Sequence, residues 1–319
     1  MSTTALVHHT IWGTHWLDSG EFSRAIEQQA PNVALRVART PAESASAVED
    51  AEILLSSFVE PWLLEEADSL EWIQAVSAGV DTLDLDALRE RDLLVTNAAG
   101  AHAQPAAEQV LGYMLTFERR LDDAIEMREN GVWERFTGGE LYGKTLGIVG
   151  LGEIGRRTAA VADAIGMDVV GTKRDPSVEI AGVDRIYPPE ELESVLVEAD
   201  YLLVACPLIE ETEGLIGREE LGVLPDDAVL INVARGGVLD QDALTTTLQQ
   251  RGIRGAALDV FGEEPLPEES TLWDLSNVIL TPHNAGVSPH LPGRLADIFT
   301  ENYEAFAAGD AESMHNRVL

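Results

Sequence analysis

The stretch T-L-G-I-V-G-L-G-E-I-G, residues 145–155, joins an apolar run to the pattern G-x-G-x-x-G. A helical pattern at 156–165 and a second strand-like run at 167–171 follow it. In the order strand, glycine turn, helix, strand, the glycines allow a tight turn and let the backbone approach a pyrophosphate at the helix N-terminus. The stretch therefore predicts dinucleotide binding. The residues expected at the pyrophosphate are Gly150, Gly152, Glu153, Ile154 and Gly155.

The end of the second strand bears on which dinucleotide is bound. A site for NAD usually has Asp or Glu there, hydrogen-bonded to the ribose 2′-hydroxyl. This chain has Thr172, Lys173 and Arg174 instead. Two cations suit a 2′-phosphate, because a phosphate accepts charge-assisted hydrogen bonds and a carboxylate would repel it. An ordinary solvated basic pair is the alternative, but the chain has only one other lysine, Lys144. We expect NADP(H) to be preferred, with NAD(H) as the weaker alternative.

The composition indicates a soluble two-domain protein. The chain has 319 residues, 45% of them hydrophobic, and no uncharged apolar run of the ~20 residues that a membrane span needs. Its first residues lack the basic and apolar regions of a secretory signal. A single cysteine, Cys206, excludes an internal disulfide. We therefore expect a cytoplasmic protein.

The charge is unusual. Fifty-six acidic residues against 21 basic ones give a formal net charge of −35. Such a charge repels nucleic acid and anionic membranes, so neither is expected as a partner. The acids are dispersed along a well-patterned chain, as in proteins of salt-accumulating halophiles. We expect the fold to need concentrated salt, which screens the repulsion between these charges.

Apolar runs alternate with helical patterns on both sides of the glycine motif. Strands are expected at 4–7, 33–37, 51–55, 72–76, 93–96, 146–149, 168–171, 201–205, 228–233, 255–258 and 278–280, and helices at 21–29, 83–90 and 105–130. The alternation predicts an α/β protein with two doubly wound parallel-sheet domains and a cleft between them. Residues 1–98 with 287–319 would form a flavodoxin-like substrate domain, and 99–286 a Rossmann domain. The segment 291–319 has a helical pattern, and no further strand is expected in it.

Three polar segments each follow an expected strand of the second domain. They contain Arg235, Glu264 and His283. Taken singly, these residues could be a structural ion pair, a solvated carboxylate and a structural histidine. Taken together, they could meet at one edge of the sheet and supply what reduction of a 2-oxo acid needs: a cation for the carboxylate, a proton donor, and a partner for that donor. No metal site is expected.

The ordered motifs resemble the D-isomer-specific 2-hydroxyacid dehydrogenases over nearly the whole chain. The resemblance rests on S-A-G-V-D at 77–81, Asn97, Gly100, 107–108, the glycine motif, 206–208, 211–212 and the three segments above. It implies that Arg235 binds the substrate carboxylate and polarises the carbonyl, that His283 is the general acid/base, and that Glu264 hydrogen-bonds His283. It also implies that the backbone amides of Ala78, Gly79 and Val80 hold the carboxylate from the other domain.

The resemblance further implies cofactor contacts and an assembly. Asp259 and the backbone at Val233 would face the nicotinamide carboxamide. Other cofactor contacts would come from Cys206, Pro207, Thr212, Ala234, His283 and Ala285. Members that use NAD carry Asp where Lys173 stands, so the chain is most similar to the NADPH-preferring glyoxylate and hydroxypyruvate reductases. A homodimer through the 105–130 region is expected.

The activity expected is NADPH-dependent reduction of a small 2-oxo acid to the D-2-hydroxy acid, with a proton from His283. Two alternatives stay open. One is a nucleotide-sensing binding protein, like the corepressors that share this fold, because fold alone does not fix function. The other is oxidation of formate or phosphite, although formate enzymes of this type usually have Gln where Glu264 stands.

Overall fold

The computed structural model describes residues 3–11, 17–80 and 82–319, and the chain divides into two compact units. The first unit is Met1–His102 with Val287–Leu319, and the second is Ala103–Gly286. Residues 99–102, expected in the cofactor domain, belong to the first unit. The reason is packing: Ala101 is buried in one core cluster with Ala98 and Leu291.

The first unit is built on a five-stranded parallel sheet in the order β2-β1-β3-β4-β5. The strands are β1 (Thr4–Val7), β2 (Ala34–Val37), β3 (Ile53–Ser56), β4 (Trp72–Ala75) and β5 (Leu94–Thr96). This is the flavodoxin-like order. Strands β1, β3 and β4 lie inside the sheet and are almost wholly buried, which explains why they read as continuous apolar runs.

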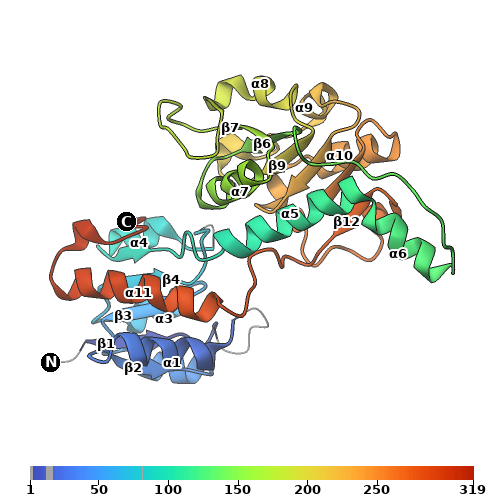
Figure 1. Ribbon diagram of the computed structural model, residues 1–319. Helices are drawn as coiled ribbons and strands as arrows, with labels where there is room; N and C mark the ends of the chain where they lie inside the picture. The colour runs from blue at the N-terminus through green and yellow to red at the C-terminus, as the bar shows by residue number, and fades with distance from the viewer. Residues whose placement is uncertain (1–2, 12–16, 81) are drawn as a thin grey trace. The chain divides into compact units, whose positions relative to one another are not determined.

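Helices cover both faces of this sheet. They are α1 (Ser19–Gln29), α2 (Pro41–Val48), α3 (Pro61–Glu66), α4 (Leu85–Glu90) and α11 (Leu291–Ala307). Helix α11 returns from the end of the chain to pack beside α1 (Figure 1). There Phe299 stacks on Trp72 of β4 with ring centroids 5.5 Å apart. The other face is covered by α2, α3 and α4.

The last residues of the chain are not helical, contrary to expectation. Arg317 forms an antiparallel bridge with Thr96, and Val318 N donates to Val95 O at 2.7 Å. Strand β5 is at the edge of the sheet, so its backbone groups were open to this pairing.

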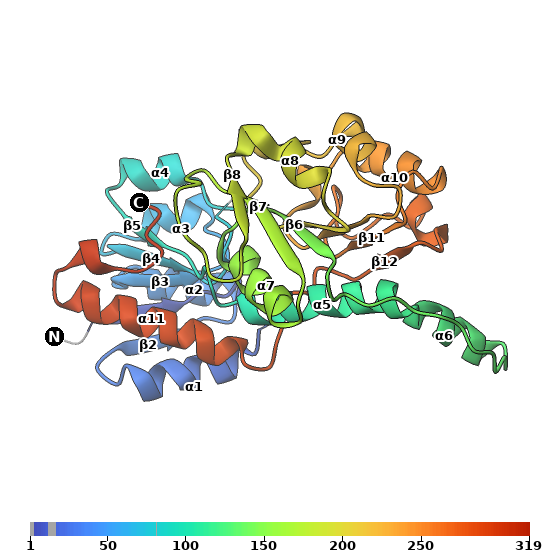
Figure 2. The same ribbon diagram turned by 45° about the horizontal axis from the view of Figure 1, so that its top comes forward.

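The second unit is built on a seven-stranded parallel sheet in the order β12-β11-β10-β9-β6-β7-β8. Figure 2 shows β8, β7 and β6 toward one side of this sheet and β11 and β12 toward the other. The strands are β6 (Thr145–Val149), β7 (Asp168–Thr172), β8 (Arg185–Tyr187), β9 (Tyr201–Val204), β10 (Val229–Asn232), β11 (Gly255–Leu258) and β12 (Val278–Leu280). In chain order, strands β6 to β11 follow the Rossmann order: β7 and β8 lie on one side of β6, and β9, β10 and β11 lie on the other. The chain therefore changes direction across the sheet between β6 and β9. Such a reversal is where nucleotides bind in open α/β sheets.

The helices of the second unit are α5 (Ala103–Arg119), α6 (Leu121–Glu129), α7 (Glu153–Ala164), α8 (Leu192–Leu196), α9 (Arg218–Val223) and α10 (Gln241–Gln249). The expected single helix at 105–130 is therefore wrong. Arg120 has a left-handed backbone, φ 53°, which ends α5 and starts α6 in a new direction. Figures 1 and 2 show α6 running away from the sheet of this unit. Within the described residues, no helix has the length and apolar character to cross a bilayer.

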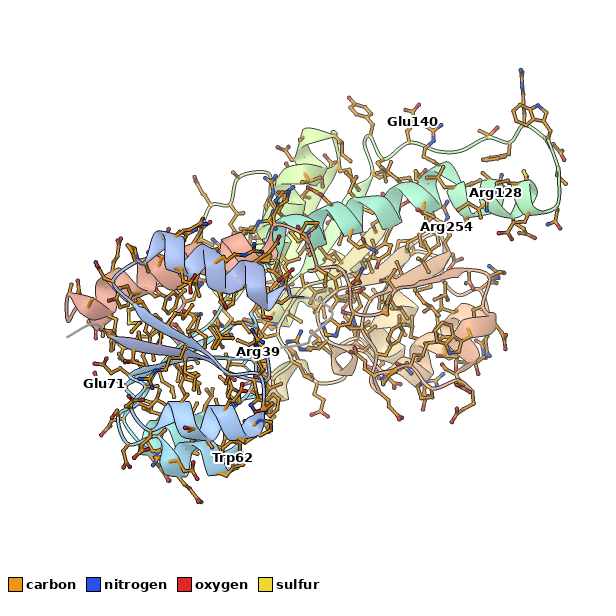
Figure 3. All side chains as sticks on the ribbon, turned by 90° about the horizontal axis from the view of Figure 1, so that it is seen from below. Arg39, Trp62, Glu71, Arg128, Glu140 and Arg254 are labelled. Carbon is orange, nitrogen blue, oxygen red and sulfur yellow. The ribbon has the colours of Figure 1, made fainter. Side chains whose placement is uncertain are left out.

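A buried polar group ties α5 to the sheet. Glu118 is 4% exposed and accepts hydrogen bonds from Tyr201 Oη at 2.6 Å and Arg254 Nη1 at 3.3 Å. Arg254 also donates to Phe117 O, and its side chain lies beside α5 (Figure 3). Burial, and then the bond to Glu118, raise the pKa of Tyr201 far above its usual value. Tyr201 is therefore a permanent donor to this carboxylate.

Candidate active site

The glycine turn after β6 has the geometry that a pyrophosphate requires. Gly150 has φ 100°, a conformation that favours glycine. A Cβ on Gly155 would lie 2.3 Å from Gly150 O, so the turn and α7 can pack this closely only without side chains. Gly152 precedes α7 and has open space where its Cβ would be. These residues fit a dinucleotide, whose phosphates would approach the turn at the N-terminus of α7.

Two other residues of the motif are less constrained. Glu153 is exposed and pairs with Arg156 at 3.4 Å on the first turn of α7. Ile154 is half-buried against the core of this unit. Their predicted roles at the cofactor would therefore use the backbone rather than the side chains.

The end of β7 is tied to the glycine turn. Thr172 is buried and its Oγ1 accepts a hydrogen bond from Gly150 N at 3.1 Å, so this hydroxyl positions the turn. Lys173 Nζ donates to Leu151 O at 3.2 Å, and Arg174 is exposed. Asp175, the next residue, is a carboxylate that the sequence pattern did not single out. Hydrogen bonds from Ser177 hold the pKa of Asp175 below its usual value, and Lys173 adds to that effect.

The loop after β9 packs against the glycine turn that follows β6. A Cβ on Gly150 would lie 2.8 Å from Cys206 Cα, so the two segments are in backbone contact. Cys206 is buried, which raises the pKa of its thiol to about 11 and keeps it protonated. Thr212 Oγ1 donates to the carbonyl of exposed Pro207 at 2.6 Å and accepts from Ile209 N at 2.9 Å. Thr212 therefore holds the shape of this loop.

Arg235 is held in a turn after β10 by a buried asparagine. Asn232 is 0% exposed; its Oδ1 accepts from Ala234 N at 3.0 Å and its Nδ2 donates to Arg235 O at 3.0 Å. Val233 and Ala234 are also buried, and the half-buried Arg235 donates from Nη1 to Ala234 O at 2.8 Å. Sequence reasoning missed Asn232, although a polar residue at the end of a buried apolar strand was a usable signal.

The Arg235 turn packs directly on the segment that leads to Glu264. A Cβ on Gly236 would lie 1.9 Å from Phe261 C and 2.4 Å from Gly262 N. Glu264 Oε1 accepts from Phe261 N at 2.9 Å, so the same backbone also orients the carboxylate. Arg235 and Glu264 are thus linked through a close contact between two loops.

Glu264 and His283 form a hydrogen-bonded pair. His283 Nδ1 lies 2.8 Å from Glu264 Oε2. Because the carboxylate accepts at Nδ1, the ring hydrogen of neutral His283 is held there and Nε2 is left for a ligand. The side chain of His283 is 52% exposed, and that of Glu264 is 35% exposed. The pair has the chemistry of a proton donor and its partner.

Asp259 anchors the loop that carries His283. It is 1% exposed, and its carboxylate accepts from Asn284 N and Ala285 N, each at 2.8 Å, and from Thr281 Oγ1. Its backbone carbonyl accepts from His283 N at 2.8 Å. His283 has φ 51°, a left-handed conformation that costs energy for a residue with a side chain. The Asp259 carboxylate, which is predicted to face the nicotinamide, therefore accepts its hydrogen bonds from the loop that carries His283.

In the first unit, the segment after β4 contains Ala78, Gly79 and Val80, which are predicted to bind the substrate carboxylate through their backbone N–H groups. Ser77 Oγ donates to Gly79 O at 2.7 Å, and Asn97 Nδ2 donates to Ala78 O at 2.8 Å, so carbonyls are turned into the protein. Among the described residues, none accepts a hydrogen bond from the N–H of Ala78, Gly79 or Val80. Asp81, part of the same motif, lies outside the described residues.

Comparison with known proteins gives consistent relatives. The family profile "D-isomer specific 2-hydroxyacid dehydrogenase, NAD binding domain" matches residues 111–285. A glyoxylate reductase of Korarchaeum cryptofilum is 34% identical over 82% of this chain and 82% of its own length. A D-3-phosphoglycerate dehydrogenase of Methanocaldococcus jannaschii is 34% identical over 91% of this chain, which spans only 56% of that longer protein.

A solved structure extends the likeness to the fold. The D-isomer specific 2-hydroxyacid dehydrogenase family protein of Aeromonas salmonicida subsp. salmonicida A449 has a TM-score of 0.87 and 31% identity, over 100% of this chain and 99% of its own. The family match, the identities and the strand orders agree with the glycine turn and the Glu264–His283 pair. The chain belongs to the D-isomer-specific 2-hydroxyacid dehydrogenases, a family of NAD(P)-dependent oxidoreductases.

Proposed function

We propose that the protein reduces a small 2-oxo acid, such as glyoxylate or hydroxypyruvate, to the D-2-hydroxy acid, with NADPH as the preferred cofactor. The observation that carries this is the 2.8 Å pair of Glu264 and His283, in which Glu264 stands on the loop that packs against the Arg235 turn. Relatives named glyoxylate reductase and glyoxylate/hydroxypyruvate reductase support the substrate class.

The roles of the side chains follow from their chemistry. Arg235 binds the substrate carboxylate, because a guanidinium matches it with two parallel hydrogen bonds. His283 Nε2 gives a proton to the carbonyl oxygen as it becomes a hydroxyl, and Glu264 stabilises the imidazolium that does so. The nicotinamide, when bound, supplies the hydride. The amides of Ala78, Gly79 and Val80 are a further group that binds the carboxylate.

The test is the initial rate of NADPH and NADH oxidation in multimolar KCl with glyoxylate, hydroxypyruvate, pyruvate, phenylpyruvate and branched 2-oxo acids. Turnover that is faster with NADPH is expected. Folded protein that binds NADPH but turns over no 2-oxo acid would instead favour a nucleotide-sensing binding protein.

The cofactor preference is tested at Arg174. We expect Arg174→Ala to weaken NADPH binding at least about 10-fold, because a hydrogen bond to a charged group contributes about 1.5–3 kcal/mol. NADH binding should hardly change. Arg174 is the better choice than Lys173, whose Nζ also holds the glycine turn through Leu151 O. The solved structure from Xanthobacter autotrophicus Py2, at 28% identity, contains NADPH and supports the expectation.

Fluorescence titration of both cofactors measures this effect. Arg218→Ala, at another exposed arginine of the same unit, is the matched control and should leave both affinities unchanged. Equal losses for NADPH and NADH at Arg174→Ala would contradict a contact with the 2′-phosphate.

A homodimer is proposed through α6 and the loop after it. Helix α6 has no buried residue, and Leu121, Ile125 and Trp133 are 45%, 52% and 101% exposed. Large apolar side chains exposed on one helix and on the loop after it are typical of a surface for association. We expect a dimer in sedimentation equilibrium, and Ile125→Glu to shift it to monomer. Val197→Glu, at an apolar residue exposed to 50% on another helix end, should not.

The salt requirement is likewise a proposal. With a net charge of −35, the folded chain repels itself, and the Debye length falls to about 3 Å at 1 M salt. We expect the Tm to rise continuously from low to multimolar KCl. A Tm that stays flat over this range would contradict a halophilic protein.

A further inference from the structure

Three side chains that the proposed function does not use converge in the first unit. His8 and His9 directly follow β1, and Glu60 directly precedes α3. His8 Nε2 lies 3.4 Å from Glu60 Oε2, and His9 Nε2 lies 3.5 Å from Glu60 Oε1. The two rings are 4.3 Å apart at 70°, and the three sets of donor atoms lie within 4.8 Å of one another.

The hydrogen bonds behind His8 determine its tautomer. Ser56 Oγ donates its only hydrogen to Phe58 O, so it must accept from His8 Nδ1, which lies 3.0 Å away. Thr10 Oγ1 also lies 2.9 Å from this nitrogen. His8 Nδ1 therefore carries the ring hydrogen, and Nε2 presents a lone pair.

Two acceptors consequently face each other inside the protein. His8 is 0% exposed, and neither His8 Nε2 nor Glu60 Oε2 has a hydrogen-bond partner among the described residues. Buried polar atoms in native proteins are nearly always satisfied, because leaving one without a partner costs free energy. A lone pair and a carboxylate oxygen are satisfied together by a cation between them.

We propose that His8, His9 and Glu60 bind a divalent transition-metal ion of the Zn²⁺ type. Two ligand atoms about 2.1 Å from a common ion are about 3.4 Å apart at a tetrahedral angle. The separations of 3.4 Å from His8 Nε2 to Glu60 Oε2 and 3.5 Å from His9 Nε2 to Glu60 Oε1 match this value for a carboxylate that binds the ion through both oxygens. Two histidines with one glutamate are a known zinc ligand set, which keeps a fourth position for water or another ligand.

The surroundings of the ligands fit the same assignment. Metal-binding histidines are held by a hydrogen bond at the other ring nitrogen. Here His8 Nδ1 is held by Ser56 and Thr10, and His9 Nδ1 lies 2.9 Å from Ser44 Oγ. Ser44 and Ser56 are both 0% exposed. A proton in place of the metal fits less well, because a charge-assisted hydrogen bond between His9 and Glu60 would be about 2.7–2.9 Å long.

The site has a defined place in the fold. It lies at the carboxyl ends of β1 and β3, and the 78–80 segment follows the carboxyl end of β4. Because these strands are parallel neighbours, both features lie at one edge of the five-stranded sheet. Adjacent histidines give no ligand spacing in the sequence, which is why the site was not expected there.

The experiment is a titration of the full-length protein, freed of metal by a chelator, with Zn²⁺ in competition with a chromophoric chelator. We expect one ion per chain, and an affinity at least 10-fold lower in His9→Gln and in Glu60→Gln. Co²⁺ should give the intense visible absorption of a tetrahedral ion. Ser44→Ala, which removes only the support behind His9, should weaken binding by about 10–100-fold.

His290→Gln and Glu65→Gln, at exposed positions of the same unit, are matched controls for weak binding to the acidic surface. Circular dichroism of the metal-free variants checks that they are folded; His9 and Glu60 are partly exposed, unlike His8. The proposal is overturned if Zn²⁺ binds no more tightly than in His9→Gln, or if the two controls weaken binding as much. Metal binding is measured without turnover. A failure to bind Zn²⁺ would therefore not contradict the proposed reductase activity, and a lack of reductase activity would not contradict the metal site.

Discussion

His283→Gln is expected to lower kcat for 2-oxo acid reduction by about 10²–10⁴-fold, the usual contribution of a positioned general acid. The amide of glutamine can still hydrogen-bond Glu264 but cannot deliver a proton from the position of Nε2. NADPH affinity should stay near that of the unaltered protein, because the glycine turn and the end of β7 do not depend on His283. Single-turnover rates and NADPH titrations separate the two effects.

Two further variants sharpen this test. Glu264→Gln keeps an acceptor at Nδ1 but removes the charge that stabilises the imidazolium, so a loss smaller than that of His283→Gln is expected. His290→Gln, at an exposed histidine elsewhere, should be fully active. If His283→Gln keeps more than about a tenth of kcat, the proton comes from another group and the assignment is wrong.

Interior strands and their ends were predictable from the sequence for one physical reason. A strand buried on both faces must be a continuous apolar run, and in a parallel sheet its carboxyl end leads to the functional edge. Arg235, Glu264 and His283 were singled out in this way, and the structure places Glu264 within hydrogen-bond distance of His283. Strand β8 was missed because Arg185–Tyr187 is short, half-exposed and at the edge of the sheet, so nothing required apolar residues there.

The supporting contacts were not predictable, because they depend on which loops meet in space. No pattern in the sequence around Asp259 predicts that its carboxylate accepts hydrogen bonds from the backbone N–H groups of Asn284 and Ala285. The break between α5 and α6 falls on Arg120, a residue that seldom adopts a left-handed backbone. The pairing of His8 with Glu60 joins residues 52 positions apart along the chain, which only the register of β1 beside β3 brings together.

Gly236→Ala is expected to lower kcat/KM on the order of 10²-fold in a folded protein, the loss that a displacement of about 1 Å can cause. The new Cβ would lie 1.9 Å from Phe261 C and 2.0 Å from Phe261 O. These are backbone atoms, which cannot rotate away as a side chain can. Either the Arg235 turn or the segment that positions Glu264 must therefore move.

Gly237→Ala is the matched control, one residue further along. The three atoms nearest to its Cβ would all belong to the flexible side chain of Leu208, with Cδ2 the closest at 3.1 Å, so activity close to that of the unaltered protein is expected. Steady-state kinetics of both variants, with circular dichroism to confirm folding, make the comparison. Equal activities for the two would mean that the contact between the loops does not position the site.

The kinetic form of the Gly236→Ala defect tells which loop moves. Displacement of Arg235 alone would weaken binding of the carboxylate and raise KM, with a smaller effect on kcat. Displacement of the Phe261–Glu264 segment would instead remove the hydrogen bond from Phe261 N that orients Glu264, and kcat would fall through His283. We expect the second outcome, because Asn232 holds the Arg235 turn with two hydrogen bonds from inside the core, whereas Glu264 is one-third exposed.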